Sequence, residues 1–256
     1  MLEVINLTKR FKGHTAVDHV NFSVRAGEIT GYLGPNGSGK STTVKMMTGL
    51  LHPTEGEVRF QGQNIRADDT AFKRRLGYVP EEPNLYGYLT GLEYLQLAGG
   101  LRGIPARQVD ERANEMLALL SLTDARWVPI SAYSKGMKQR VLIAAALLHD
   151  PDVLIFDEAQ SGLDIANALL FRYLVRALAS RGKAVLYISH VLELVEKVCE
   201  HVVVIYKGRI VADDKVGRLR ELMHLANLEE IFSQLVQQDD MESRARDIVE
   251  LISRKT

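Results

Sequence analysis

The sequence predicts an α/β fold with a mixed sheet, an N-terminal antiparallel β subdomain, an inserted helical subdomain and a helical C-terminal tail. Short stretches before residue 34 alternate apolar and polar side chains, as in residues 20–24, which is typical of half-buried antiparallel strands. The apolar runs at residues 153–156 and 184–188 predict parallel strands that are buried on both faces. Between these two kinds of strand, residues 90–150 carry leucine and methionine at helical spacing, which indicates the inserted helical segment.

The other elements of the core follow from local patterns in chain order. An apolar strand at residues 29–33 runs into a glycine-rich loop, and we expect a helix from Lys40 to about residue 50, where Gly49 ends it. Residues 57–80 contain a further hairpin-like stretch and, before Pro80, the apolar tripeptide at 77–79. Beyond the helical segment, an amphipathic helix at about 167–179 joins the two buried strands, and a third apolar strand at 201–206 closes the core.

The tail beyond residue 210 differs from the core in composition and is expected to be helical. Its apolar residues recur at helical spacing on one stripe. The stripe either packs onto the core or contacts a partner, and packing is the favoured interpretation. The residues concerned are Leu228, Ile231, Phe232, Leu235, Val236, Ala245, Ile248, Val249 and Ile252.

Composition restricts the classes of function. The chain has 256 residues, 46% hydrophobic and 25% charged, and its formal net charge is zero, as in ordinary globular proteins. A neutral chain lacks the basic surface that nucleic-acid binding requires, so we expect no nucleic-acid partner. The single cysteine, Cys199, excludes an internal disulfide and favours a reducing compartment. The longest apolar run, residues 141–148, is far below the ~20 residues of a membrane span, and no N-terminal signal is visible. We therefore expect a cytoplasmic protein.

Residues 34–41 carry a phosphate-binding pattern. Gly34 and Gly39 stand at the spacing of a P-loop and are followed by Lys40 and Ser41. Glycines let successive backbone N–H groups turn into one concavity, and the following helix adds its positive end. The lysine would contact the β- and γ-phosphates, and the serine hydroxyl would ligate Mg²⁺. With a strand before it and a helix after it, this loop predicts a P-loop NTPase core.

Two carboxylates at the end of the buried strand 153–156 complete this chemistry. Asp157 follows the strand directly and can hold Mg²⁺, while Glu158 projects farther and can accept a proton from the attacking water. Either acid alone could belong to an exposed turn. The pair, together with the P-loop, predicts a site for hydrolysis of a nucleoside triphosphate.

Residues 133–140, Tyr-Ser-Lys-Gly-Met-Lys-Gln-Arg, resemble the signature motif of the ATP-binding-cassette (ABC) family. With the P-loop and the acidic strand end in the same order as in that family, the resemblance covers about residues 1–210. It implies that Ser134 and Gly136 contact the γ-phosphate of ATP held by a second subunit. Ser134 can also cap the helix that follows, which would aim backbone N–H groups outward.

The motif departs from the family's Leu-Ser-Gly-Gly-Gln form. Tyr133, Lys135 and Met137 replace three of its five residues, and such variants resemble exporter-type cassette proteins. Lys135 either adds positive charge near the phosphate or points into solvent.

The resemblance also implies roles for other positions. Phe11 falls where the family stacks an aromatic ring on adenine, although a core phenylalanine is the alternative. Glu81 falls where the family has a glutamine that contacts Mg²⁺, and Asp164 falls in the loop that joins two sites across a dimer. His190 would hydrogen-bond the γ-phosphate, either by orienting water or by holding the glutamate. The implied catalytic residues are Lys40, Glu158 and His190; the metal ligands are Ser41, Glu81 and Asp157; and the nucleotide-binding residues are Phe11, Val17, Asn36, Gly37, Ser38, Gly39, Lys40, Ser41, Thr42, Ser134, Gly136 and Asp164.

The implied domains are a nucleotide-binding domain at 1–210 and a helical extension at 211–256. Within the first, residues 91–150 form the helical subdomain with the signature motif, and residues 1–90 and 151–210 form the core and the β subdomain.

The implied function is that of an ATP-hydrolysing subunit of a membrane transporter, with ATP and Mg²⁺ as cofactors. Its partners would be a permease on a separate chain and a second ABC subunit, which can be an identical copy. Its place would be the cytoplasmic face of the membrane, and export is favoured over import. A soluble ABC ATPase for assembly or regulation, an importer subunit and a non-hydrolytic nucleotide sensor are the alternatives. The presence of both Glu158 and His190 argues against the sensor.

Overall fold

The computed structural model describes residues 1–225, 227–236, 249 and 252. Within them, a central sheet has six strands in the order β10-β9-β3-β8-β7-β6. Five of these strands run parallel, and only β10 is antiparallel to its neighbour. They are β3 (Ile29–Leu33), β6 (Leu76–Val79), β7 (Val153–Asp157), β8 (Ala184–Ile188), β9 (His201–Tyr206) and β10 (Arg209–Lys215). As the apolar runs predict, β3, β7 and β8 are buried along their whole length.

The N-terminal region forms a second sheet, in the order β2-β1-β4-β5, with every pairing antiparallel. Its strands are β1 (Leu2–Phe11), β2 (His14–Val24), β4 (Glu55–Phe60) and β5 (Gln63–Asn64). The hairpin expected within residues 57–80 is formed by β4 and β5, and the expected apolar tripeptide at 77–79 lies in β6. The helix between them, α2 (Asp69–Arg75), was not predicted. Asp68 caps this helix by accepting a hydrogen bond from the Ala71 N–H, and three basic residues in the last turn favour the negative helix end.

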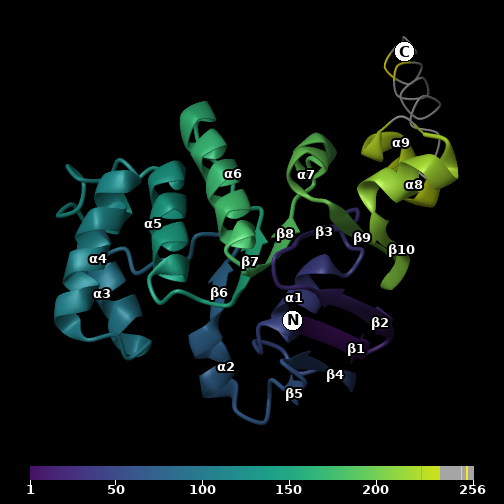
Figure 1. The fold of residues 1–256 in the computed structure, drawn as a ribbon, viewed down its shortest axis with the longest axis horizontal. Coiled ribbons are helices and arrows are strands. Elements are labelled where there is room, and N and C mark those ends of the chain that lie inside the picture. The colour runs from purple at the N-terminus through teal and green to yellow at the C-terminus, as the bar shows by residue number, and fades with distance from the viewer. Residues whose placement is uncertain (226, 237–248, 250–251, 253–256) are drawn as a thin grey trace.

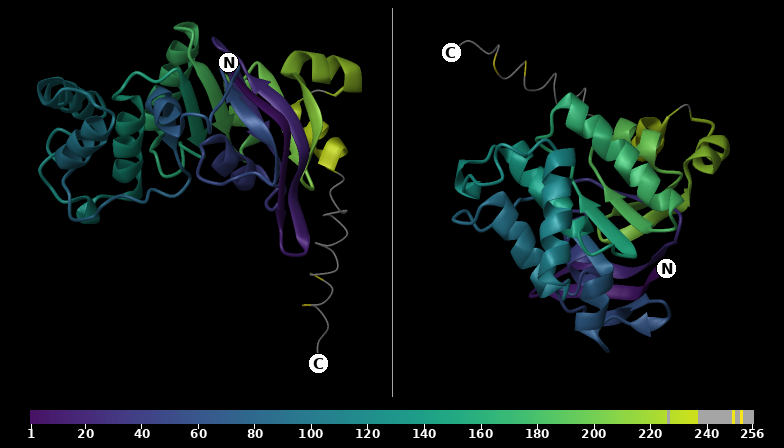
Figure 2. Two further views of the ribbon diagram at one scale, coloured as in Figure 1. Left: turned by 90° about the horizontal axis from the view of Figure 1, so that it is seen from below. Right: turned by 60° about the vertical axis from the view of Figure 1, so that its left-hand side comes forward.

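Helices cover the central sheet, and some of them form a separate subdomain at one side of it. α3 (Gly91–Leu101), α4 (Ala106–Leu119), a 3₁₀ turn (Ile130–Ala132) and α5 (Lys135–Leu147) form a helical subdomain with its own apolar cluster. Figure 2 shows α3 and α4 standing apart from the N-terminal sheet, with the central sheet between them. The remaining helices of the described chain are α1 (Lys40–Met47), α6 (Ile165–Ser180), α7 (Leu192–Val198), α8 (Val216–Met223) and α9 (Leu228–Val236).

Two apolar clusters fill the two faces of the central sheet. Alternate residues of β7 point to opposite faces, so Phe156 packs with Phe171 of α6 on one face while Ile155 packs with Val44 of α1 on the other. The second face is covered by α1 and the N-terminal sheet. The carboxyl ends of β3, β7 and β8 therefore open at one edge, where the loops that follow them meet.

The first helix of the C-terminal region begins at Val216 and not at residue 211. Residues 211–215 continue β10, whose alternating exposed and half-buried side chains suit an edge strand paired with β9. Leu228, Ile231 and Phe232 are buried against the core, which supports packing as the role of this part of the stripe. Ala245 and Ile248, and the side chain of Val236, lie outside what the structure describes. No helix among the described residues is both long and apolar enough to cross a membrane.

Candidate nucleotide site

The glycine-rich loop between β3 and α1 can form only with glycine at its crowded positions. Gly39, the residue before α1, has φ 109°, and a Cβ there would lie 2.6 Å from the Ala16 carbonyl oxygen. A Cβ on Gly34 would lie 2.4 Å from the Ile205 carbonyl oxygen. Because contacts this short do not occur, the loop depends on both glycines.

Lys40 curls back over this loop from the first turn of α1. Its Nζ donates hydrogen bonds to the carbonyl oxygens of Gly34 at 2.6 Å and Pro35 at 3.1 Å. Burial lowers the pKa of Lys40, while the carboxylates of Glu158, Asp157 and Glu81 act in the opposite direction. The lysine charge therefore lies beside the three carboxylates that the sequence assigns to this site.

Glu158 has an uncommon backbone conformation that fixes its side chain. Its φ is +49°, in the left-handed region that non-glycine residues rarely adopt, and its N–H donates to the Ile188 carbonyl oxygen at 3.0 Å. Its Oε1 accepts hydrogen bonds from the backbone N–H and the Nδ1–H of His190, at 2.7 and 2.8 Å. Strained backbone held by neighbouring structure is frequent at functional sites.

These groups line one open pocket of about 540 Å³. It contains eleven of the residues that the sequence assigns to the site, together with two that it does not, His14 and Ala16. Phe11 is 48% exposed at the pocket edge, so it does not belong to the core. Its ring lies 5.3 Å from Lys9 Nζ. The lining residues are Phe11, His14, Ala16, Asn36, Gly37, Gly39, Lys40, Ser41, Thr42, Glu81, Asp157, Glu158 and His190.

His14 and Ala16 reach the pocket because the β1–β2 hairpin folds over it. His14 pairs directly with Phe11 across the turn. The adenine-stacking role expected of Phe11 was therefore the one feature of the sequence that could have pointed to His14. Val17, in contrast, is fully buried behind the P-loop. Ser38 is also buried and does not line the pocket, and its hydroxyl has no hydrogen-bond partner among the described residues.

Three predicted residues, Ser134, Gly136 and Asp164, lie on a separate face. We call this face the signature surface, and its residues are Ser134, Lys135, Gly136, Ser161, Gly162 and Asp164. None of them lines the P-loop pocket. Ser134 is exposed and caps α5, its Oγ accepting from the Met137 N–H at 3.2 Å. Asp164 is exposed and caps α6, and the hydrogen bond from the Asn167 backbone N–H lowers the pKa of its carboxyl.

The signature surface is held together by close packing of its two segments. A Cβ on Gly136 would lie 2.5 Å from the Gly162 carbonyl oxygen, so only glycine fits at this position. Lys135 packs along Gly162, and its Nζ donates to Ser161 Oγ at 2.7 Å. The lysine thus joins the segment of Ser134 to the segment of Asp164 within the chain. The sequence predicted that Lys135 lies near the phosphate or points into solvent, and this contact is neither.

Comparison with known proteins places the chain in a family. The ABC transporter family model matches residues 17–161. An uncharacterized ABC transporter ATP-binding protein of Bacillus subtilis is 38% identical over 213 residues, covering 82% of this chain and 68% of the relative. The Nod factor export ATP-binding protein I of Ralstonia nicotianae is 37% identical over 219 residues, covering 86% and 68%. The chain belongs to the ABC transporter family of ATP-binding proteins.

Solved structures agree with the ABC fold. An ATP-binding subunit of an ABC transporter superimposes with a TM-score of 0.87 at 31% identity, covering 92% of this chain and 99% of that one. The ATP-binding cassette MJ0796, in a dimeric post-hydrolysis state bound to ADP and Pi, gives 0.78 at 28% identity, covering 84% and 98%. The predicted mixed α/β fold with an antiparallel N-terminal sheet is therefore confirmed.

The ABC pocket of this chain fits a hard divalent cation. Burial raises the pKa of the Asp157 carboxyl to about 6, and the charges of Glu81 and Glu158 add to the rise. A buried carboxylate beside two others gains from a cation next to it. Ser41 and Glu81 line the same pocket, and their oxygens are donors that Mg²⁺ prefers. The described residues contain no group of three or more His, Cys, Asp and Glu side chains able to hold a metal by themselves.

Proposed function

We propose that this chain is the ATP-hydrolysing subunit of a membrane ABC transporter, and that ATP closes two such subunits on each other to drive a permease on a separate chain. The observation that carries the proposal is the pocket in which Lys40, Asp157, Glu158 and His190 converge. A site that only bound nucleotide would need no more than the P-loop. A carboxylate that lies beside the P-loop and is held by a histidine suits general-base hydrolysis of that nucleotide.

Each group of the chain has a defined task in this proposal. The backbone N–H groups of the P-loop and Lys40 bind the phosphates. Ser41, Asp157 and Glu81 would hold Mg²⁺, which neutralises phosphate charge when bound. Glu158 accepts a proton from water as the water oxygen attacks the γ-phosphorus and the bond to the ADP oxygen breaks. His190 occupies Glu158 Oε1 with two short hydrogen bonds, whereas Oε2 receives one long contact of 3.4 Å from Ser189 Oγ, so we assign Oε2 to accept the proton.

This geometry favours one of the two roles considered for His190. Its backbone N–H and its Nδ1–H both donate to Glu158 Oε1, so we assign it to holding the glutamate. Ser189 assists weakly, since its Oγ lies 3.4 Å from Glu158 Oε2.

A second subunit is part of the proposal because the signature surface lies away from the chain's own pocket. Ser134 and Asp164 are exposed, and their side chains make only local capping hydrogen bonds. Exposed caps that aim helix N-termini outward can complete the phosphate site of another copy. The dimeric relative MJ0796, bound to ADP and Pi, supports this arrangement.

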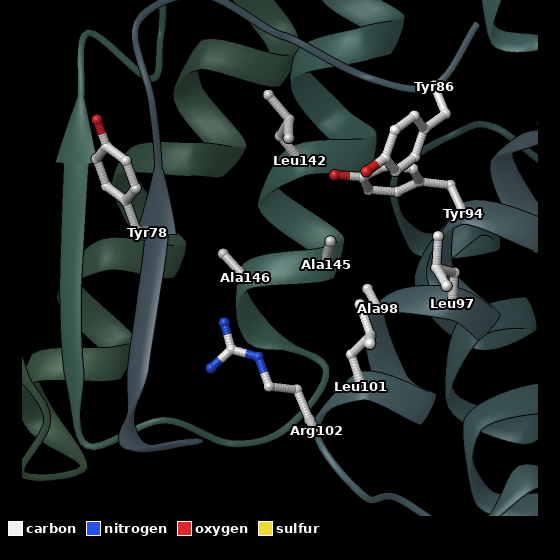
Figure 3. Close-up of a pocket in the computed structure, with 10 residues that line it drawn as sticks. All are labelled: Tyr78, Tyr86, Tyr94, Leu97, Ala98, Leu101, Arg102, Leu142, Ala145 and Ala146. Carbon is white, nitrogen blue, oxygen red and sulfur yellow. The ribbon is translucent and has the colours of Figure 1, made fainter. Parts of the chain in front are cut away.

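A groove between the helical subdomain and β6 is our proposed contact for the permease. It encloses about 280 Å³, and its lining residues are Tyr78, Tyr86, Tyr94, Leu97, Ala98, Leu101, Arg102, Leu142, Ala145 and Ala146. Figure 3 shows Tyr86 and Tyr94 side by side on one wall and Tyr78 on the other, with Arg102 at one end. Tyr78 and Tyr86 flank Glu81 in sequence, so the groove adjoins the nucleotide pocket.

Charge in this groove indicates what the permease would supply. Arg102 donates one hydrogen bond, to the Leu76 carbonyl oxygen at 3.2 Å, and no ion pair joins it to a carboxylate in the described part of the chain. Burial lowers the pKa of Arg102, so a carboxylate beside it would be stabilising. An apolar permease segment that carries one acidic residue fits this groove.

Export is the proposed direction of transport. The variant signature motif resembles exporter-type proteins, and the relative from Ralstonia nicotianae is named for Nod factor export. We place the subunit on the cytoplasmic face of the membrane, because its ATP would come from there.

The test is purification from a detergent-solubilised membrane fraction, with ATPase activity measured for the parent and for Glu158→Gln. We expect a co-purifying membrane protein, retained ATP binding, a dimer that accumulates and a loss of turnover of about 10²-fold or more. Undiminished hydrolysis by the variant would contradict the assigned base. Recovery only from soluble complexes would favour an assembly or regulatory ATPase instead.

A further inference from the structure

The helix that follows His190 is too short to hold its own position. α7 has seven residues, and isolated helices below about 12 residues are marginal in water. Its inner side is packed tightly against the strand that leads into the P-loop, because a Cβ on Gly31 would lie 2.6 Å from Val195 Cγ1. The position of α7, and of His190 just before it, therefore depends on what packs around it.

The C-terminal helices α8 and α9 pack beside α7. α9 contacts α7 directly, and Leu228 and Ile231 are fully buried in the same apolar cluster as Val195 and Val198. In Figure 1, α8 and α9 lie beyond α7 at the end of the central sheet. Helices from the end of the chain thus pack against the segment that positions the catalytic histidine.

One side chain ties all three helices together. Glu196 of α7 forms an ion pair with Arg220 of α8, and its Oε2 accepts from the backbone N–H of Leu228, the first residue of α9, at 3.4 Å. Its side chain is only 18% exposed. A carboxylate at a helix N-terminus is stabilised by the helix dipole, and a charge this buried is costly to leave unpaired.

We propose that α8 and α9 set the position of His190 through α7, with Glu196 as the positioning residue, so that the C-terminal helices govern the hydrolytic step without touching nucleotide. The inference rests on the proposed ATPase function. His190 holds Glu158 through hydrogen bonds of 2.7 and 2.8 Å, and a displacement of about 1 Å in catalytic geometry can cost about 10²-fold in rate. A small shift of α7 is therefore enough to change turnover.

The far end of α7 is anchored independently of Glu196. Arg176 of α6 donates to the Lys197 carbonyl oxygen, and the Val216 N–H donates to the Glu200 carbonyl oxygen at 2.9 Å. Loss of the Glu196 contacts should therefore shift α7 without detaching it, so a variant at this position can fold.

The experiment compares Glu196→Gln with Glu193→Gln in the full-length chain. Glu193 lies on the same helix, is 79% exposed and, within the described part of the chain, pairs only with Lys197, at 3.7 Å, so it is a matched control. We expect Glu196→Gln to lower kcat about five-fold, the change that about 1 kcal/mol of activation free energy produces, with KM for ATP unchanged. Glu193→Gln should keep the parental kcat.

Two further measurements separate positioning from general loss of structure. Arg220→Gln should lower kcat to a similar extent, and the double variant should be no worse than either single one, because the residues act as a pair. In ¹⁵N spectra of labelled histidine, the Nδ1 signal of His190 should move in Glu196→Gln and not in the control. A thermal unfolding midpoint for each variant identifies any that fails to fold.

The failure of this inference differs from the failure of the proposed function. Parental kcat in folded Glu196→Gln, or equal losses in Glu196→Gln and Glu193→Gln, overturns the positioning role alone. Absence of ATP hydrolysis by the parent, both alone and with its membrane partner, overturns the proposed function and this inference with it.

Discussion

The P-loop pocket and the signature surface carry the candidate chemistry of this chain, and they are built in opposite ways. In the pocket, loops after β3, β7 and β8 converge within one chain, and Asp157 is 7% exposed. On the signature surface, Ser134 and Asp164 are exposed, and among the residues that the structure describes their side chains hydrogen-bond only to their own helices. The difference supports our proposal that one chain suffices to bind nucleotide, whereas closure around it needs a second.

The largest expected effect that separates the two regions is that of Ser134→Ala. Since the Ser134 hydroxyl is proposed to reach the γ-phosphate of the other copy, its loss should lower ATP turnover about 10²-fold, as for loss of one donor that stabilises transition-state charge. Nucleotide binding by the single chain should be unchanged. Turnover assays and fluorescent-nucleotide titration measure the two effects.

A capping control separates this role from helix stability. Ser134→Ala also removes the N-cap of α5, which typically costs about 1 kcal/mol. Asp68→Ala removes the cap of α2, where Asp68 accepts from the Ala71 N–H at 2.9 Å, far in sequence from both regions. Equal losses of turnover in the two variants would show that Ser134 acts only as a cap.

A smaller effect is expected from Asp157→Asn on the stability of the chain measured without nucleotide. The folded-state pKa of Asp157 is raised from 3.8 to about 6, so above pH 6 the folded chain bears the full penalty of a buried charge. Between about pH 6 and pH 4, the folded chain keeps a proton that the unfolded chain has lost, and stability rises as pH falls. The asparagine variant should lose this pH dependence and be more stable at pH 7 by an amount on the order of 2 kcal/mol.

Chemical denaturation at pH 5 and pH 7.5, with and without Mg²⁺, measures this prediction. Mg²⁺ should stabilise the parent and have little effect on Asp157→Asn, because the cation binds next to that carboxylate. Glu81→Gln is the companion variant, since Glu81 is exposed and acts on the pKa of Asp157 only through its charge. It should reduce the pH dependence of stability without abolishing it. An unchanged slope in Asp157→Asn would show that another group titrates.

Sequence patterns predicted those parts of the molecule whose structure is determined by a single short stretch of residues. Uninterrupted apolar runs identified β7 and β8, because only burial on both faces tolerates them. The spacing of glycines and Lys40 identified the P-loop for a similar reason, since phosphate binding fixes the residue types. The roles of the individual pocket residues in catalysis remain predictions, although eleven of them line one pocket.

What the sequence did not predict depends on contacts between distant segments. α2 was missed because Phe72 is its only buried residue, so its apolar periodicity is absent. The pairing of Lys135 with Ser161 and of Glu196 with Arg220 joins segments whose distance the sequence does not reveal. Charged residues on helices usually belong to solvated faces, and nothing local marks these as exceptions.

The smallest expected effect tests whether the signature surface depends on its internal contact. Lys135 Nζ donates to Ser161 Oγ at 2.7 Å and so joins the segment of Ser134 to the segment of Asp164. Lys135→Ala should reduce ATP-dependent dimer formation and turnover about three-fold, the effect expected when one exposed hydrogen bond is lost. Lys138→Ala is the matched control, because Lys138 lies one turn along α5 and its side chain has no hydrogen bond or ion pair with the described residues. If ATP-dependent dimerisation, measured by size-exclusion chromatography, falls equally in both variants, positive charge on α5 and not the contact with Ser161 is responsible. A loss confined to Lys135→Ala would mean that the two halves of this surface must be held in register before a second chain can close on them.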